Sequence, residues 1–199
     1  MTEPFETHQR HECTIHIFQD DCAENPRDAL DTTVRLVCWH SRYRLGDQHG
    51  FDAPAGFQAW WAEAEEGGLC VPLYPDHSGL ALATRPFHCP WDSGQVGWAY
   101  MTADTIADEL SHVPIPARLA AARSLIDAEV ELYHAYLSGD VWGYVIERAD
   151  GTNVDSSWGY YGLKAVREAA DDSARHHTDP SPIPVVAGVQ ASNGDIRHG

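Results

Sequence analysis

Residues 117–138, ARLAAARSLIDAEVELYHAYLS, form the most regular pattern in the chain. Apolar side chains recur there at steps of three and four residues, which is the spacing of one face of an α-helix. These apolar residues are Leu119, Ala122, Ile126, Val130, Tyr133 and Leu137, and the opposite side carries Arg123, Asp127, Glu131 and His134. Gly139 follows and suits a helix end, because glycine accepts a left-handed conformation. The pattern predicts a long amphipathic helix.

Short runs of β-branched and aromatic residues on both sides of this helix predict strands. The runs are Thr14–Phe18, Thr32–Tyr43, Leu69–Tyr74, Leu80–Thr84, Gln95–Met101, Val141–Arg148 and Ser156–Tyr161. Turn residues at 75–79 and at Asp150-Gly151 join neighbouring runs into hairpins, and hairpins make antiparallel sheets. The sequence therefore predicts an α+β fold: a mostly antiparallel sheet of five to seven strands, covered by the long amphipathic helix. Shorter helices are expected at 54–66, 102–112 and 163–174.

The length of 199 residues is typical of one domain. Residues 1–12 are polar and predict a flexible N-terminus, so the single α+β domain is expected to span 13–175. From residue 176 the chain is rich in Pro, Gly, Ser and Asn and has no apolar period. This composition predicts a disordered tail over 176–199.

Charge is the outlying property of the composition. The chain has 13 Lys and Arg against 30 Asp and Glu, which gives a net charge of −17 with His neutral. Direct binding of nucleic acid is not expected, because phosphate contacts need cationic side chains. Five acidic residues, Asp20, Asp21, Glu24, Asp28 and Asp31, fall in one predicted loop, where Arg27 is their only opposite charge. Such a loop is either a solvated surface or a site for a basic partner.

The five cysteines are an odd number, and no Cys-x-x-Cys pair occurs among them. The N-terminus has no apolar signal segment, and no run approaches the length needed to span a membrane. These observations predict free thiols, no membrane contact and a cytoplasmic location in a host cell. The oligomeric state does not follow from the sequence.

Residues 86–98, PFHCPWDSGQVGW, hold the densest mixture of aromatic, turn-forming and reactive side chains. Asp92, Ser93 and Gly94 are typical turn residues, bracketed by Trp91 and Trp98. The candidate binding residues are His77, His88, Trp91, Asp92, Ser93 and Gln95. They would bind a ligand or hold the loop in shape.

A catalytic role for the same stretch is the bolder reading. Cys89 or Ser93 would be the nucleophile, with His77 or His88 as the base and Asp76 or Asp92 orienting it. No Gly-x-Ser-x-Gly elbow occurs, however, and Pro90 lacks the backbone N–H that an oxyanion would need. We therefore assign no catalytic residue. We also expect no metal or cofactor, because the His and Cys residues lack the paired spacing of structural zinc and no phosphate-binding glycine loop occurs.

Five segments together resemble a family of small proteins encoded by bacteriophages and other mobile elements, largely without an assigned activity. They are FQDDCAENPR (18–27), CWHSRYRLGD (38–47), PLYPDHSG (72–79), CPWDSGQVG (89–97) and GDVWGY (139–144). Where the family pattern has Asp-Ser-Cys-Trp-Gly, this chain has Ser157 in place of the cysteine. The resemblance implies a phage or mobile-element origin and brings no catalytic residues with it.

Two hypotheses about function follow. The first is an acidic interaction protein that binds a basic site on a host protein which handles nucleic acid, for example as an anti-restriction or anti-CRISPR inhibitor that imitates DNA charge. The second is a small enzyme or ligand-binding protein with a pocket at the 74–98 loop, using His88, Cys89 and Asp92.

Overall fold

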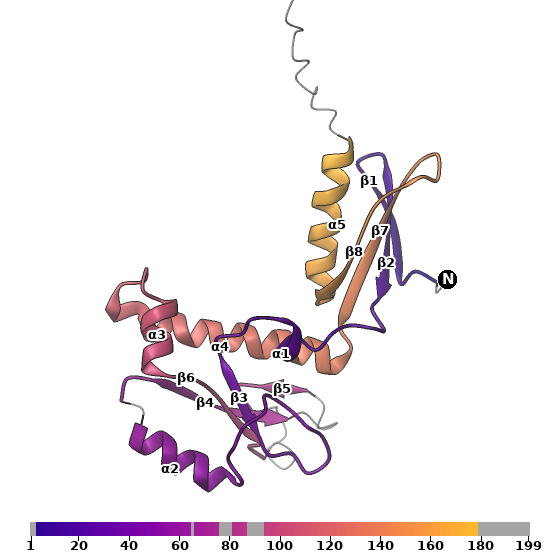
Figure 1. Cartoon of the computed structure of the whole chain (residues 1–199). Helices are drawn as coiled ribbons and strands as arrows, with labels where there is room; N and C mark the ends of the chain where they lie inside the picture. The colour runs from indigo at the N-terminus through magenta and orange to yellow at the C-terminus, as the bar shows by residue number, and fades with distance from the viewer. Residues whose placement is uncertain (1–2, 65, 76–80, 87–93, 179–199) are drawn as a thin grey trace, which may run out of the picture.

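The computed structural model describes residues 3–64, 66–75, 81–86 and 94–178. These residues form five helices and eight strands, and the strands make two antiparallel sheets of four strands each. The α+β class predicted from the hairpin signals is confirmed. The described residues differ from the prediction in having two sheets with separate cores, where one sheet of five to seven strands was expected. Figure 1 shows the two sheets in two lobes of the molecule.

The first sheet combines strands from the two ends of the described chain. Its order is β1 (Glu6–Arg10), β2 (Cys13–Gln19), β7 (Val141–Arg148) and β8 (Asn153–Tyr161). Helix α5 (Leu163–Thr178) covers one face, as Figure 1 shows. Because alternate strand residues share a face, Ile15, Ile17 and Ile146 all meet this helix, where Val166 and Ala170 are buried against them.

The second sheet comes from the middle of the chain, with the order β3 (Arg35–Cys38), β6 (Gly97–Met101), β4 (Leu69–Pro75) and β5 (Leu82–Ala83). Helix α4 (Ile115–Ser138) packs on one face, against Leu36, Val71 and Ala99. Helix α2 (Pro54–Ala64) lies on the other face, where Phe57 contacts Trp98 and Tyr100 (Figure 1). The sheet is therefore a central layer between two helices.

Helix α4 matches the predicted periodicity closely. Ala122, Ile126, Val130 and Tyr133 are buried as expected, and Gly139 ends the helix with φ 72°. Leu119 is the exception, since it lies near the start of the helix and is 51% exposed. The chain passes from Gly139 almost directly into β7, so this helix of the second lobe leads into the first (Figure 1).

Two short helices have side-chain caps that explain where they begin. The Thr102 hydroxyl accepts a hydrogen bond from the Thr105 amide at the start of α3 (Ala103–Glu109). The Asn25 side chain accepts one from the Arg27 amide at the start of α1 (Pro26–Ala29), with Pro26 at the first helical position. The predicted helix beginning at Thr102 is thereby confirmed, although it is shorter than expected.

Three boundaries differ from the sequence-based expectations. Strand β1 lies inside residues 1–12, the segment expected to be flexible, because Glu6–Arg10 pairs along its whole length with β2. Strand β3 is shorter than the predicted 32–43, and the His40 ring accepts the backbone N–H groups of Arg42 and Tyr43 in a turn instead. Helix α5 continues to Thr178, past the expected start of the tail, and residues 179–199 lie outside the described part of the chain.

No helix among the described residues is long and apolar enough to cross a membrane.

Candidate functional site

The central stretch singled out from the sequence is only partly described. His77, His88, Cys89, Trp91, Asp92 and Ser93 lie outside the described residues, so the turn and the ligand-binding site predicted there stay predictions. Of the candidate binding residues only Gln95 is described. Its amide donates a hydrogen bond to the Gly97 carbonyl, 3.0 Å away, which is a contact within its own loop.

Trp98 has a structural role that the sequence analysis did not assign. Its ring lies 5.1 Å from Phe57 and 5.8 Å from Trp39, centroid to centroid, in the aromatic cluster between α2 and the second sheet. Trp60 and Trp61 both lie near Tyr100 in the same cluster, at 5.7 and 5.5 Å. Trp98 is half-buried in this cluster. Packing against other aromatic rings therefore explains why a tryptophan occurs at this position, and no ligand is needed to explain it.

A cavity of about 490 Å³ lies between strand β5 and the polar side of α4. It is lined by Leu82, Ala83, Thr84, Arg85, Asp127, Val130, Glu131 and His134. Leu82 and Val130 are buried and give the cavity an apolar floor. Strand β5 belongs to the 74–98 segment, where the second functional hypothesis places a pocket. The cavity is therefore lined in part by described residues of that segment.

Three hydrogen bonds fix the polar groups of this cavity. The Thr84 hydroxyl donates to Asp127 Oδ1 at 2.6 Å, and Arg123 Nε donates to Asp127 Oδ2 at 2.9 Å. His134 Nδ1 lies 3.0 Å from the Leu82 carbonyl oxygen, which can only accept, so Nδ1 carries the hydrogen. In the neutral ring Nε2 is then left as an acceptor.

Electrostatics make Asp127 a stable anion in this site. The hydrogen bond from Arg123 is the main cause that lowers the pKa of the Asp127 carboxyl, and the Thr84 hydroxyl and the Arg85 charge act in the same direction. Glu131 is exposed and forms no ion pair with the described residues. The cavity therefore offers a fixed imidazole acceptor and a carboxylate from α4, with Arg85 from the end of β5 beside them. This set is able to orient a small polar ligand.

The sequence analysis placed Arg123, Asp127, Glu131 and His134 on one side of the predicted helix, which is correct. It did not select them as a site, because the same spacing is typical of a solvated helix face. Thr84 and Arg85 were missed altogether. Only the pairing of β5 with β4, which brings residues 82–85 beside α4, reveals that the two groups meet.

The acidic loop at 20–31, which follows β2 and contains the short helix α1, is the second region that the sequence singled out. Asp21, Glu24, Asp28 and Asp31 are exposed, and Asp20 is half-buried. None of these five carboxylates forms an ion pair with a described residue. The loop is tied to the first lobe through Tyr161, whose hydroxyl donates to the Glu24 carbonyl at 3.0 Å.

Arg27, the only basic residue of that loop, turns away from it and into the protein. Its side chain is 2% exposed. Nε and Nη2 each donate to Asp47 at 2.8 Å, Nη1 donates to Glu129 at 2.7 Å, and Nη2 also donates to the Val34 carbonyl at 2.6 Å. The sequence analysis counted Arg27 as an opposite charge for the loop. In the structure that charge is taken up by Asp47 and Glu129, so the loop carboxylates keep their full negative charge.

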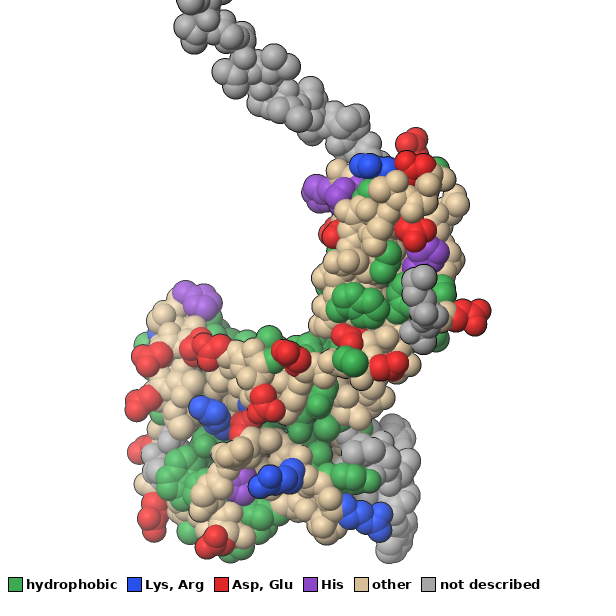
Figure 2. All heavy atoms as spheres, turned by 45° about the vertical axis from the view of Figure 1, so that its right-hand side comes forward, with side chains coloured by type: hydrophobic (Ala, Val, Ile, Leu, Met, Phe, Trp, Pro, Cys, Tyr) green, Lys and Arg blue, Asp and Glu red, His purple; other side chains and the backbone are tan. Residues whose placement is uncertain are grey.

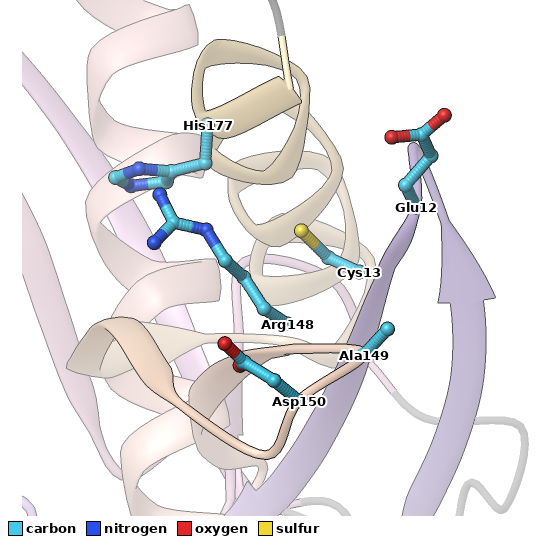
Figure 3. A pocket seen from close by; sticks show the side chains of 6 residues that line it. All are labelled: Glu12, Cys13, Arg148, Ala149, Asp150 and His177. Atoms are coloured by element: carbon cyan, nitrogen blue, oxygen red, sulfur yellow. The ribbon is translucent and has the colours of Figure 1, made fainter.

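A further cavity, of about 350 Å³, lies at the far end of the first lobe (Figure 3). It is lined by Glu12, Cys13, Arg148, Ala149, Asp150 and His177. Figure 3 shows the Arg148 and His177 side chains meeting at one side of the Cys13 sulfur. Cys13 is almost fully buried. The hydrogen bond from the Thr152 amide is the main cause that lowers the pKa of the Asp150 carboxyl, and the charge of Arg148 acts in the same direction. None of these residues belongs to a predicted site, and the arrangement favours no particular chemistry.

Among the described residues no group of His, Cys, Asp and Glu side chains has the arrangement of a metal site. Ser157, at the position where the resembled family has cysteine, accepts a hydrogen bond from the Tyr160 hydroxyl at 3.2 Å. Comparison with known proteins adds nothing to this picture: no family model, curated protein or solved structure matches the chain.

Proposed function

We propose that this chain is an acidic interaction protein of phage or mobile-element origin that acts in the cytoplasm of a host cell. Its partner is a host protein that handles nucleic acid and has a basic surface, and imitation of DNA charge would make it an inhibitor of restriction or CRISPR machinery. The origin rests on the resemblance of segments such as residues 89–97. The observation that carries the mode of binding is the inward turn of Arg27, which leaves the loop at 20–31 uniformly acidic.

The physical reason is electrostatic complementarity. A net charge of −17 attracts a basic surface over a long range and raises the rate of association. Loop carboxylates that form no ion pair with a described residue have no such pair to break when they meet Lys or Arg side chains. Figure 2 shows acidic side chains on both lobes and fewer Lys and Arg side chains on the face drawn, so the attraction does not depend on the loop alone.

The test compares two variants with equal net charge. In the first, the five loop carboxylates (Asp20, Asp21, Glu24, Asp28 and Asp31) become amides. In the control, five exposed carboxylates elsewhere (Asp52, Glu63, Asp104, Asp108 and Glu109) become amides. Each tagged protein is used as bait in host lysate at low and high salt, and retained proteins are quantified by mass spectrometry.

We expect the parent chain and the control to retain the same nucleic-acid-handling protein at low salt, and the loop variant to lose it. Retention should fall at high salt, because exposed charges are screened. Equal retention by the two variants would refute the role of the loop, and retention that salt does not affect would refute charge mimicry.

A second candidate function, a ligand-binding protein or small enzyme, is favoured by the cavity between β5 and α4. Here Glu131 and His134 would bind polar groups of a small ligand over the apolar floor. Ligands found by an NMR screen should lose binding in Glu131→Gln and His134→Gln and keep it in Leu119→Ala, an exposed site on the same helix. The central stretch, residues 86–98, is tested by three separate variants, His88→Ala, Cys89→Ala and Asp92→Ala. If all three fold and keep the ligand binding or activity of the parent chain, the central stretch has no part in this function.

A further inference from the structure

The face of the first sheet opposite α5 carries an aromatic pair, Phe18 on β2 and Trp158 on β8. Their ring centroids are 5.9 Å apart. Between the two strands runs β7, where Gly143 lies directly opposite Phe18. A Cβ atom at Gly143 would lie 2.2 Å from the Trp158 ring, so only glycine lets the indole rest on the sheet.

This pair reaches solvent, since Trp158 is 50% exposed. The apolar core of the lobe is on the other side of the sheet, where α5 packs on Ile15, Ile17 and Ile146. An indole that is held in place by its neighbours yet half in water leaves a large apolar surface that a partner can bury. Tryptophan in such a position is typical of a contact residue in a protein interface.

The aromatic pair is continuous with the acidic loop. Alternate residues of a strand share a face, so Asp20 follows Phe18 on the same side of the chain. The Asp20 amide donates to the Val141 carbonyl at 2.8 Å, which continues the β2–β7 ladder past Gln19 and keeps that alternation. Asp21 and the other exposed carboxylates of the loop come next.

We propose that Trp158, Phe18 and the adjoining Asp20 carboxylate form a surface that binds arginine side chains of a basic partner protein. A guanidinium stacks on an indole face and at the same time donates hydrogen bonds to a carboxylate. The charge of the loop selects a basic occupant over an apolar one, and the net charge of −17 disfavours a second copy of this chain. The proposal rests on the proposed function and names the side chain that the surface recognises.

The test measures the binding of octa-arginine and octa-lysine peptides by titration calorimetry at low salt. In Trp158→Ala we expect the affinity for octa-arginine to fall about 3- to 30-fold, as loss of a cation–π contact predicts, with a smaller change for octa-lysine. Leu119→Ala removes an equally exposed apolar side chain from the other lobe and should leave both affinities unchanged. In the parent chain, octa-arginine should shift the indole N–H resonance of Trp158, a readout that does not depend on any variant folding.

Three outcomes separate this inference from the proposed function. Unchanged octa-arginine affinity in a folded Trp158→Ala, or an unmoved Trp158 resonance, would refute the arginine surface. Loss of the host partner in the loop-amide variant, together with its retention by Trp158→Ala, would support the proposed function and would show that it does not need the arginine surface. Arginine-specific binding at Trp158 with no host partner retained would support the surface and refute the proposed function.

Discussion

Arg27 and Asp47 form a two-pronged ion pair in which Nε donates to Oδ1 and Nη2 to Oδ2, both at 2.8 Å. Arg27 comes from the short helix α1, and Asp47 also accepts the Leu36 amide of β3 at 2.8 Å. Glu129 of α4 pairs with the same guanidinium and accepts the Thr33 and Val34 amides. The Arg27 guanidinium therefore ties α1 to the loop after β3 and to α4, which lies about a hundred residues further along the chain.

Removing this buried guanidinium should be strongly destabilising. In Arg27→Met two carboxylates lose their partner, and breaking a buried ion pair in this way costs about 3–5 kcal/mol. Arg27→Lys should recover only part of the loss, because an ammonium group lacks the planar fork. Urea unfolding followed by circular dichroism measures the free energies. The control is Lys164→Met, which removes an exposed pair with Glu168. The Lys164 side chain is 89% exposed, so its loss should cost less than about 1 kcal/mol. Equal losses in Arg27→Met and Lys164→Met would contradict the expectation.

Asp155 should make the stability depend on pH in the acid range. The hydrogen bond from Ser173 is the main cause that lowers the pKa of the Asp155 carboxyl, and those from Tyr144 and the Ser156 amide add to it. A lowered pKa means that the folded state favours the ionised form. The resulting stability is fully present above the unfolded pKa of about 4 and is lost as the pH falls through the lower folded value.

Asp155→Asn should therefore reduce the free energy of unfolding by about 1.5–3 kcal/mol near neutral pH, the range for a hydrogen bond to a charged group. The difference from the parent chain should shrink as the pH falls below about 4. Urea titrations at a series of pH values test this, with Asp52→Asn at an exposed position as the control. A difference that stays constant down to the lowest pH would show that the Asp155 charge makes no contribution.

Much of the fold could be predicted because its signals are local. The spacing of Ile126, Val130 and Tyr133 fixed α4, and Asp150-Gly151 fixed the β7–β8 hairpin, since each pattern lies within one element or one turn. The division into two sheets could not be predicted in this way. Strand β2 pairs with β7, more than a hundred residues further on, and nothing in either strand identifies its partner.

The candidate sites were less predictable for the same reason. Arg27 looked like a surface charge because its neighbours in sequence are acidic, whereas its real partners, Asp47 and Glu129, come from elsewhere in the chain. The role of Gly143 was equally hidden, because the ring that it accommodates belongs to another strand. Local patterns predict which elements form, and only packing decides which side chains meet.

The described cysteines should differ sharply in their reactivity toward thiol reagents. Cys22 is exposed, whereas burial raises the pKa of both Cys38 and Cys70 to about 12. Because the thiolate is the reactive form, these two should react about a thousandfold more slowly than an ordinary thiol at about pH 8. Timed alkylation followed by mass spectrometry measures the rates, in a Cys89→Ser background because Cys89 lies outside the described residues. In denaturant, all cysteines should be alkylated at similar rates, which is the control. Rapid alkylation of Cys38 in the native protein would contradict its buried position.

Gly143 should tolerate no side chain as long as Trp158 is present. In Gly143→Ala the new Cβ would lie 2.2 Å from the indole ring, so the ring must leave its place beside Phe18, at a cost of about 1–3 kcal/mol. Gly56→Ala is the matched control, because that site lies in α2 with nothing within 4 Å, and alanine should stabilise a helix there by about 0.5–1 kcal/mol.

A double-mutant cycle identifies the cause of the loss. If the indole is the obstacle, Gly143→Ala should cost almost nothing in a Trp158→Ala background, since the obstacle is then gone. An equal cost in both backgrounds would mean that the strand backbone, and not Trp158, requires glycine. The same cycle measured on octa-arginine binding should show that Gly143→Ala weakens binding only while Trp158 is present, because the glycine acts by holding the indole where a guanidinium can stack on it.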